Sequence, residues 1–178
     1  MGYTGNNGAW LMENLYYGTD GNWKHKNSDF SAAIEMYDGV FNFYNTASGT
    51  ADATATLQNR LKIDALGNVG IGVTPSTGWV SSTDFTALQI GSGLALWGRG
   101  SGDHERLGLT ANLYHDGSAF KHLNTGRVTS YEQNDGKHIF KYYASQAAGT
   151  SVTPTTAMMI DTSGHTHIGP SDDDTRIT

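Results

Sequence analysis

The sequence contains no cysteine among its 178 residues. A disulfide framework and a thiolate metal site are therefore excluded. Lysine and arginine number 11 against 17 aspartates and glutamates, which gives a formal net charge of −6 at pH 7. No basic patch is visible, so we expect neither a nucleic-acid partner nor an anionic membrane surface as partner.

Long apolar runs are also missing. No run approaches the roughly 18 residues that cross a membrane as a helix. The N-terminus has neither the basic region nor the apolar region of a secretory signal. The sequence therefore predicts no membrane insertion.

The residues that usually build a core are scarce. Leu, Ile, Val and Phe number 32 of 178, about 18% of the chain, which is below the level at which chains begin to look disordered. The small net charge and the nine Tyr and four Trp indicate instead an ordered protein with a thin core. A thin core predicts that part of the apolar surface is buried between chains.

One stretch occurs twice, as LKIDALGNVGIG at 61–72 and as MMIDTSGHTHIG at 158–169. Equivalent positions lie 97 residues apart, and the match continues upstream, where NLYYGTDGNWKH (14–25) resembles NLYHDGSAFKH (112–122). Such a period predicts a repeat architecture with units of about a hundred residues. Because Met1 falls within a unit, we expect residues 1–12 to be the frayed end of a cut unit, in a fragment whose parent begins earlier.

Each copy of the stretch predicts a strand, a tight turn and a second short strand. Val69 and Ile71 alternate with Asn68 and Gly70, a pattern typical of a half-buried strand. Gly67 is expected to supply the positive φ of a two-residue hairpin turn. Further turn signals, such as Asp20-Gly21, Asp38-Gly39 and Asp135-Gly136, separate short strands elsewhere. The sequence therefore predicts an all-β fold of short antiparallel strands and hairpins, without a convincing helix.

The repeat also predicts the domain organisation. Residues 1–72 form a first, truncated β repeat, 73–84 a linker with Pro75 and Gly78 as breakers, and 85–169 a second β repeat. Residues 170–178 begin the next linker or tail.

The motif Ile63-Asp64-Ala65-Leu66-Gly67-Asn68-Val69-Gly70-Ile71-Gly72, followed by Val73-Thr74-Pro75, resembles a repeat of bacteriophage tail-fibre and tailspike proteins. The resemblance covers nearly the whole chain. It implies an elongated, intertwined homotrimer on the virion, extracellular when it functions, that contacts other virion tail or fibre proteins and supports attachment to the host receptor.

His165 and His167 stand where the first copy has Asn68 and Gly70. Alternate residues of a strand point to one face, so three chains around an axis would present six imidazoles, an octahedral nitrogen set suited to Fe(II), Ni(II) or Co(II). Iron held by paired histidines on a trimer axis is what the resemblance implies. The alternative is a pair of surface histidines, because an axis lined by Val69 and Ile71 would turn this face to solvent.

Other repeated residues favour structural roles. Lys24-His25 and Lys121-His122 recur at strand ends, and a duplicated catalytic site one unit away is rare in enzymes. Glu35 and Glu132 recur as single carboxylates, whereas a glycosidase needs a pair at defined separation. We therefore predict no catalytic residue and no enzymatic activity, with a polysaccharide depolymerase as the weakest alternative.

The function that these observations predict is mechanical: a trimeric fibre shaft that places a receptor-binding surface away from the virion. The main alternative is that the segment itself binds a host surface glycan. The four tryptophans, with the nine tyrosines, are then the candidates for stacking on sugar: Trp10, Trp23, Trp79 and Trp97. Trp79, in the linker, is the one expected to be exposed, and no receptor-binding residue is named.

Overall fold

The computed structural model describes residues 2–4, 8–80, 85–101, 104–169 and 176–177. Over these residues the chain is all-β, as predicted, and its only helical element is η1 (Thr77–Val80), a single 3-10 turn. No helix in this part is long and apolar enough to cross a membrane. The chain divides into two compact units, Met1–Thr74 and Pro75–Thr178.

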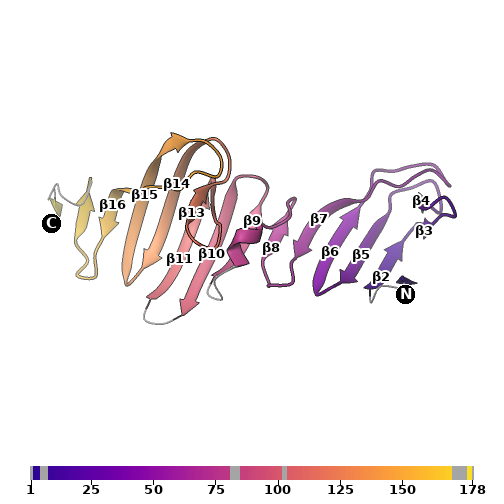
Figure 1. Ribbon diagram of the computed structural model, residues 1–178, viewed down its shortest axis with the longest axis horizontal. Coiled ribbons are helices and arrows are strands. Elements are labelled where there is room, and N and C mark those ends of the chain that lie inside the picture. The colour runs from indigo at the N-terminus through magenta and orange to yellow at the C-terminus, as the bar shows by residue number, and fades with distance from the viewer. Residues whose placement is uncertain (1, 5–7, 81–84, 102–103, 170–175, 178) are drawn as a thin grey trace. The chain divides into compact units, whose positions relative to one another are not determined.

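The first unit is a meander of short strands beside a small hairpin (Figure 1). Its strands are β1 (Gly2–Thr4), β2 (Gly8–Glu13), β3 (Leu15–Tyr17), β4 (Trp23–His25), β5 (Ala32–Tyr37), β6 (Val40–Asn45), β7 (Gln58–Ile63) and β8 (Val69–Ile71). The antiparallel sheet runs in the order β1-β2-β5-β6-β7-β8, and β3 pairs with β4 separately. The prediction of a frayed end is wrong, because β2 pairs with β5 over five residue pairs and Trp10 is buried.

The second unit repeats this order, with β9 added before it and β18 after it. Its strands are β9 (Phe85–Ile90), β10 (Leu94–Ser101), β11 (His104–Ala111), β12 (Leu113–His115), β13 (Phe120–His122), β14 (Gly126–Asn134), β15 (Lys137–Gln146), β16 (Thr155–Ile160), β17 (Thr166–Ile168) and β18 (Arg176–Ile177). The sheet runs β9-β10-β11-β14-β15-β16-β17-β18, and β12 pairs with β13 separately. Residues 170–175 and 178 of the predicted tail lie outside the described residues.

The registers of the two units match in detail. Phe41 pairs with Ile63 in one unit and His138 with Ile160 in the other. A shift in register follows Phe43 in β6 and Phe140 in β15, at equivalent positions. An extra residue at such a shift bends the strand, so both sheets are irregular at the same point.

The hairpin turn of the repeated motif differs from the prediction. The backbone N–H of Asp64 bonds to the carbonyl of Asn68 at 2.9 Å, and Gly67 has φ +86°. The turn therefore has three residues rather than two, with glycine in the left-handed position, which is a common three-residue hairpin. The carboxylate of Asp64 accepts the N–H groups of Leu66 and Asn68, which explains why this turn begins with aspartate.

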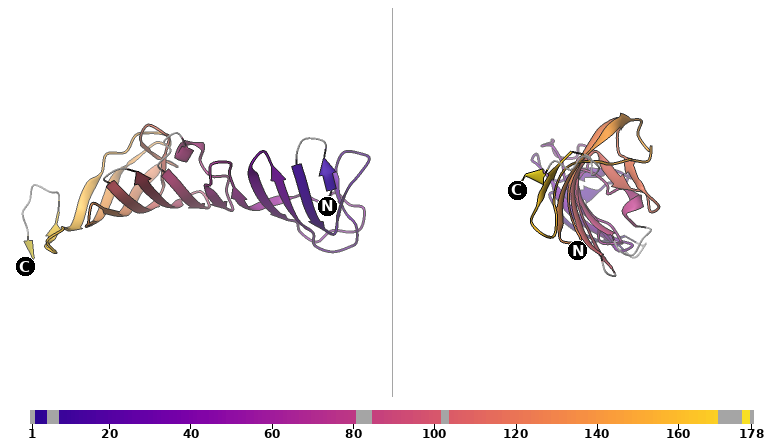
Figure 2. Two further views of the ribbon diagram at one scale, coloured as in Figure 1. Left: turned by 90° about the horizontal axis from the view of Figure 1, so that it is seen from below. Right: turned by 90° about the vertical axis from the view of Figure 1, so that its left-hand side faces the viewer.

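One face of each sheet carries the core. In the first unit the buried cluster contains Trp10, Leu15, Ala33 and Ala55, with Trp23 of the β3–β4 hairpin packed on it. Figure 2 shows the sheet of the second unit nearly on edge, with η1 and the neighbouring loops on one side of it. The chain therefore covers one face of each sheet with its own hairpin and loops.

Part of the predicted linker belongs to the core of the second unit. The side chain of Trp79, on η1, is fully buried and packs with Phe85, Ala87 and Trp97. The ring of Trp97 lies directly over Gly108, where an added Cβ would come within 2.2 Å of it. The prediction that Trp79 is exposed is wrong, because residues near Pro75 and Gly78 fold back onto the sheet instead of running free; residues 81–84 lie outside the described part.

Candidate functional site

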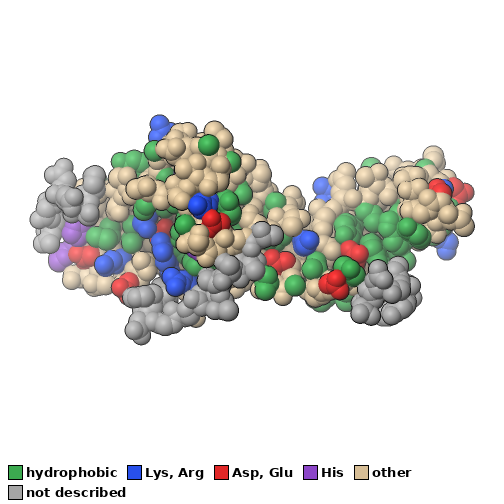
Figure 3. Space-filling model, in the orientation of Figure 1, with side chains coloured by type: hydrophobic (Ala, Val, Ile, Leu, Met, Phe, Trp, Pro, Cys, Tyr) green, Lys and Arg blue, Asp and Glu red, His purple; other side chains and the backbone are tan. Residues whose placement is uncertain are grey.

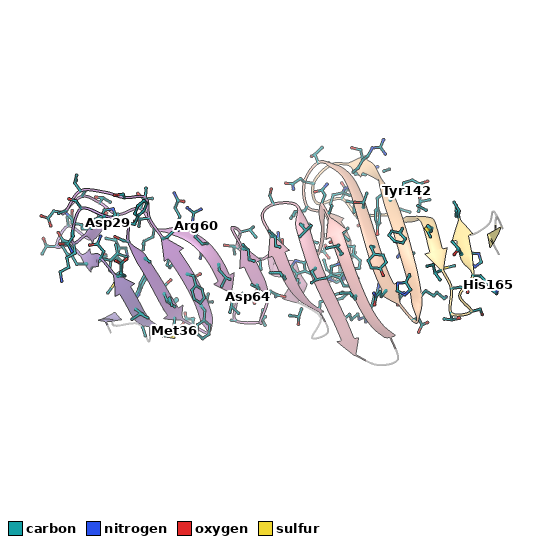
Figure 4. All side chains as sticks on the ribbon, turned by 180° about the vertical axis from the view of Figure 1, so that it is seen from behind. Asp29, Met36, Arg60, Asp64, Tyr142 and His165 are labelled. Atoms are coloured by element: carbon teal, nitrogen blue, oxygen red, sulfur yellow. The ribbon has the colours of Figure 1, made fainter. Side chains whose placement is uncertain are left out.

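The face of the first sheet that lacks this cover carries two apolar rows beside a polar row that includes Glu13 and Asn45. Directly paired residues form a row across five strands, and a second row lies two residues along each strand. Cross-strand partners and residues two apart share a face. We call this set the first apolar face: Leu11, Ile34, Phe43, Leu61 and Ile71 in one row, and Ala9, Met36, Phe41, Ile63 and Val69 in the other. Leu11 is 60% exposed and Ile71 is 41% exposed, and Met36 can be followed in Figure 4.

The second sheet has a matching face. Its central row crosses seven strands in register. We call this set the second apolar face: Leu88, Leu96, Leu109, Tyr131, Phe140, Met158 and Ile168, flanked by Ile90, Leu94, Leu107, Tyr142 and Ile160. Leu109 is 46% exposed and Phe140 is 44% exposed; Tyr142 is labelled in Figure 4.

In the first copy of the repeated motif, the buried residues are therefore the polar and small ones, and not the apolar ones that alternation alone would place in a core. Asn68 is 1% exposed, and Gly70 is also buried, whereas Ile71 on the alternate face is exposed. The polar residue points toward the covered side, where its side chain meets Asp64 at 3.0 Å. The apolar residues of the motif face outward, a direction that only a neighbouring molecule could bury.

The two histidines singled out in the sequence converge on one carboxylate. His167 Nε2 lies 2.9 Å from Asp161 Oδ2, and His165 Nδ1 lies 3.5 Å from the same oxygen. The hydrogen bond from His167, followed by the backbone N–H of His165, holds the pKa of Asp161 well below its ordinary value, against a small opposing effect of desolvation. Histidine and acidic side chains lie together at this end of the second unit in Figure 3, and His165 is labelled in Figure 4.

A single chain does not assemble a metal site from the residues that the structure describes, because no group of three or more His, Cys, Asp or Glu side chains there could hold an ion. His167 already uses Nε2 for its bond to Asp161. A metal held by His165 and His167 therefore depends on ligands from other chains and on release of the Asp161 contact.

The repeated histidines at the strand ends are buried. His25 is 3% exposed and its Nδ1 lies 2.9 Å from the hydroxyl of Ser31. That hydroxyl donates to the carbonyl of Asn14, so it accepts from His25. His122 is 1% exposed, but Val128 stands where the first unit has Ser31, and its Nδ1 has no hydrogen-bond partner among the described residues. These histidines are core residues rather than ligands open to a substrate.

The repeated glutamates are held by polar partners. Glu35 accepts hydrogen bonds from Asn42 and Tyr44. Glu132 is 1% exposed and is paired with Arg106 and, at 2.7 Å, with Lys141. Burial raises the pKa of Glu132, but the two cations together outweigh burial and lower it. A carboxylate enclosed in this way stabilises the sheet and has no access to a polysaccharide.

Comparison of the chain with protein-family models, with curated proteins and with solved structures finds no match. Function must therefore be argued from the geometry and from the sequence motifs. Of the features described, the apolar faces are the largest, and the composition pointed to them only indirectly, through the thin core.

We predict that Ser31→Val lowers the free energy of unfolding by about 1–3 kcal/mol, because it leaves the buried Nδ1 of His25 and the carbonyl of Asn14 without the hydroxyl. The valine copies the residue found beside His122. Urea denaturation followed by tryptophan fluorescence measures the change. The reciprocal Val128→Ser variant gives His122 a partner and should lose clearly less stability; equal losses would contradict the assigned hydrogen bond.

We predict that Asp161→Asn lowers the melting temperature at pH 7 more than at pH 2. The lowered pKa of Asp161 in the fold means that its contribution is present above the pKa of about 3.9 of an unfolded aspartate and disappears as the pH falls further. Thermal unfolding at both pH values measures the difference. Asp64→Asn, at the equivalent turn without histidines, serves as the matched control, and a pH-independent loss at Asp161 would contradict the ion-pair interpretation.

Proposed function

We propose that this chain is a structural segment of a bacteriophage tail fibre, built from two copies of one repeat and assembled as a parallel homotrimer. The observation that carries the proposal is the pair of uncovered apolar faces. Monomeric proteins rarely leave apolar patches of this extent in contact with water. Packing the same faces of several chains around a common axis buries them and also protects the edges of the sheets.

The sequence motifs supply the biological setting. The repeated Ile-Asp-x-x-Gly stretch resembles tail-fibre repeats, and a meander without an open catalytic carboxylate pair suits a spacer. The mechanism is mechanical: the assembled shaft on the virion contacts other fibre or tail proteins and holds a receptor-binding surface at a distance. We propose no enzymatic activity.

The alternative of a glycan-binding module loses the one tryptophan that was expected to be exposed. Trp79 packs inside the second unit, so a Trp79→Ala variant would report on folding rather than on sugar stacking. Binding to a host glycan stays an alternative that no geometric feature of the described residues favours.

We expect the native particle to have about three times the mass of the 19.1 kDa chain. Leu109→Asp places a charge in the middle of the second apolar face, and the desolvation cost of a charge in a dry interface should shift the particle toward a monomer. Native mass spectrometry or light scattering measures the mass. Leu66→Asp is the matched control, because Leu66 is 59% exposed on a turn outside both apolar faces; a monomeric wild-type chain would refute the shaft.

His167 pairs with Met159, so His165 and His167 lie on the side of the sheet opposite to Met158 and Ile168 of the second apolar face. A trimer that turned this opposite side toward its axis would bring six imidazole nitrogens together, the number that octahedral ions prefer, and we propose a transition-metal ion, with iron as the expected metal, for that alternative packing. Bound ion in the purified trimer, lost together with thermal stability in His165→Ala, would support this packing against the one in which the apolar faces line the axis. A metal-free trimer whose melting temperature is unchanged by His165→Ala would leave these residues as surface histidines bonded to Asp161.

A further inference from the structure

The second apolar face contains a polar cluster that the first apolar face lacks. The hydroxyl of Tyr131 lies 2.6 Å from Nδ1 of His138, and Gln133 donates to the same hydroxyl at 3.1 Å. All three side chains lie on the uncovered side, on β14 and β15, and the ring of Tyr131 also packs on Phe140 at 4.9 Å. The equivalent positions in the first unit are Ile34, Met36 and Phe41.

The two residues that pair directly with His138 are uncharged. His138 pairs with Gln133 on one side and with Ile160 on the other, and Thr166 follows Ile160 across the sheet. Tyr131 is the only other titratable side chain on this face in contact with His138 among the described residues. The charged residues Arg106, Lys141 and Glu132 form their ion pairs on the opposite, covered face.

We propose that Tyr131, Gln133 and His138 form a polar layer in the interface between copies of this chain, packed against the same residues of the other copies around the axis. This layer accommodates His138 only in its neutral form. The proposal rests on the homotrimer proposed above. A polar group within an apolar interface makes misaligned packing costly, because a shift of one strand leaves it buried without a partner. The cluster would therefore align the second units, while the first units supply uninterrupted apolar contact.

The hydrogen bonds explain why the neutral form is required. Gln133 donates to Tyr131, so the tyrosine hydroxyl is free to donate its proton to Nδ1 of His138. Protonation turns Nδ1 into a donor, and the hydroxyl proton must then turn away into the interface. Three like charges would also meet near the axis. Histidine is the side chain that ordinarily changes charge between pH 5 and 8, so mild acid should loosen the assembly.

The test compares the trimer–monomer equilibrium of the wild type with that of His138→Phe, which copies Phe41 of the first unit. Sedimentation equilibrium at pH 7.5 and pH 5.5 measures it. We expect the midpoint concentration for dissociation of the wild type to rise about tenfold or more at pH 5.5, because uncompensated charge in a dry interface is costly. The variant should change by less than about twofold, since it removes the histidine of this cluster. Equal pH dependence in both proteins would overturn the proposal.

Two further variants distinguish failure of the proposed polar layer from failure of the proposed trimer. In the Leu109→Asp background, which is expected to be monomeric, thermal unfolding should give the same pH dependence with histidine and with phenylalanine at position 138. A difference that persists there would place the effect of the cluster within one chain and overturn the proposal. The triple variant Ile34→Tyr, Met36→Gln, Phe41→His should add a second pH-sensitive layer to the first unit. A wild type that is monomeric at pH 7.5 would instead refute the proposed trimer itself.

Discussion

Each sheet has two faces, and this chain supplies cover for only one of them. The β3–β4 and β12–β13 hairpins, the long loops and η1 all serve the covered side, where Trp10 and Trp97 are buried. The opposite side presents rows of Leu, Ile, Phe and Met in register. Water at an apolar surface of that extent is the largest unfavourable feature of the isolated chain. The thin core is a consequence of this one-sided cover, and the assembly proposed above would bury the other side.

The two sides of the sheet divide the chemistry between them. Charged and hydrogen-bonded groups, including the ion pairs of Glu132 and the Glu35–Tyr44 contact, lie on the covered face, where nearby loops and strands satisfy them. An antiparallel sheet normally turns its polar residues to the uncovered face, whereas here that face is largely apolar and the covered face carries both the aromatic core and these polar groups. This distribution is expected if the uncovered apolar face of each sheet becomes the interior of the proposed assembly. The polar residues of the covered side then belong to the outer surface of the shaft.

Much of the fold could be predicted from the sequence, because turn residues and alternation act locally. The Asp38-Gly39 and Asp135-Gly136 turns and the hairpin across 91–93 lie where glycine and aspartate indicated them. The burial of Trp79 could not be predicted, because its position follows from the packing of η1 on β9 and β12, a contact between residues far apart in sequence. The partner of His165 and His167 could not be predicted for a different reason: Asp161 accepts turn N–H groups through Oδ1, and only the folded hairpin brings its second oxygen to an imidazole.

The alternation in the motif indicated two faces but not which one the chain covers. In Asn68-Val69-Gly70-Ile71 the apolar residues would face the core of an ordinary monomer, yet Asn68 is the buried residue. A pattern of period two fixes the relation between neighbours, and the covering elements decide which side is inside. Covering hairpins with the same register occur in both units, so both sheets turn the same face outward. The chain therefore leaves equivalent faces uncovered in both units. In the proposed assembly, a difference between these faces, such as His138 at the position of Phe41, would tune association without disturbing the fold of either unit.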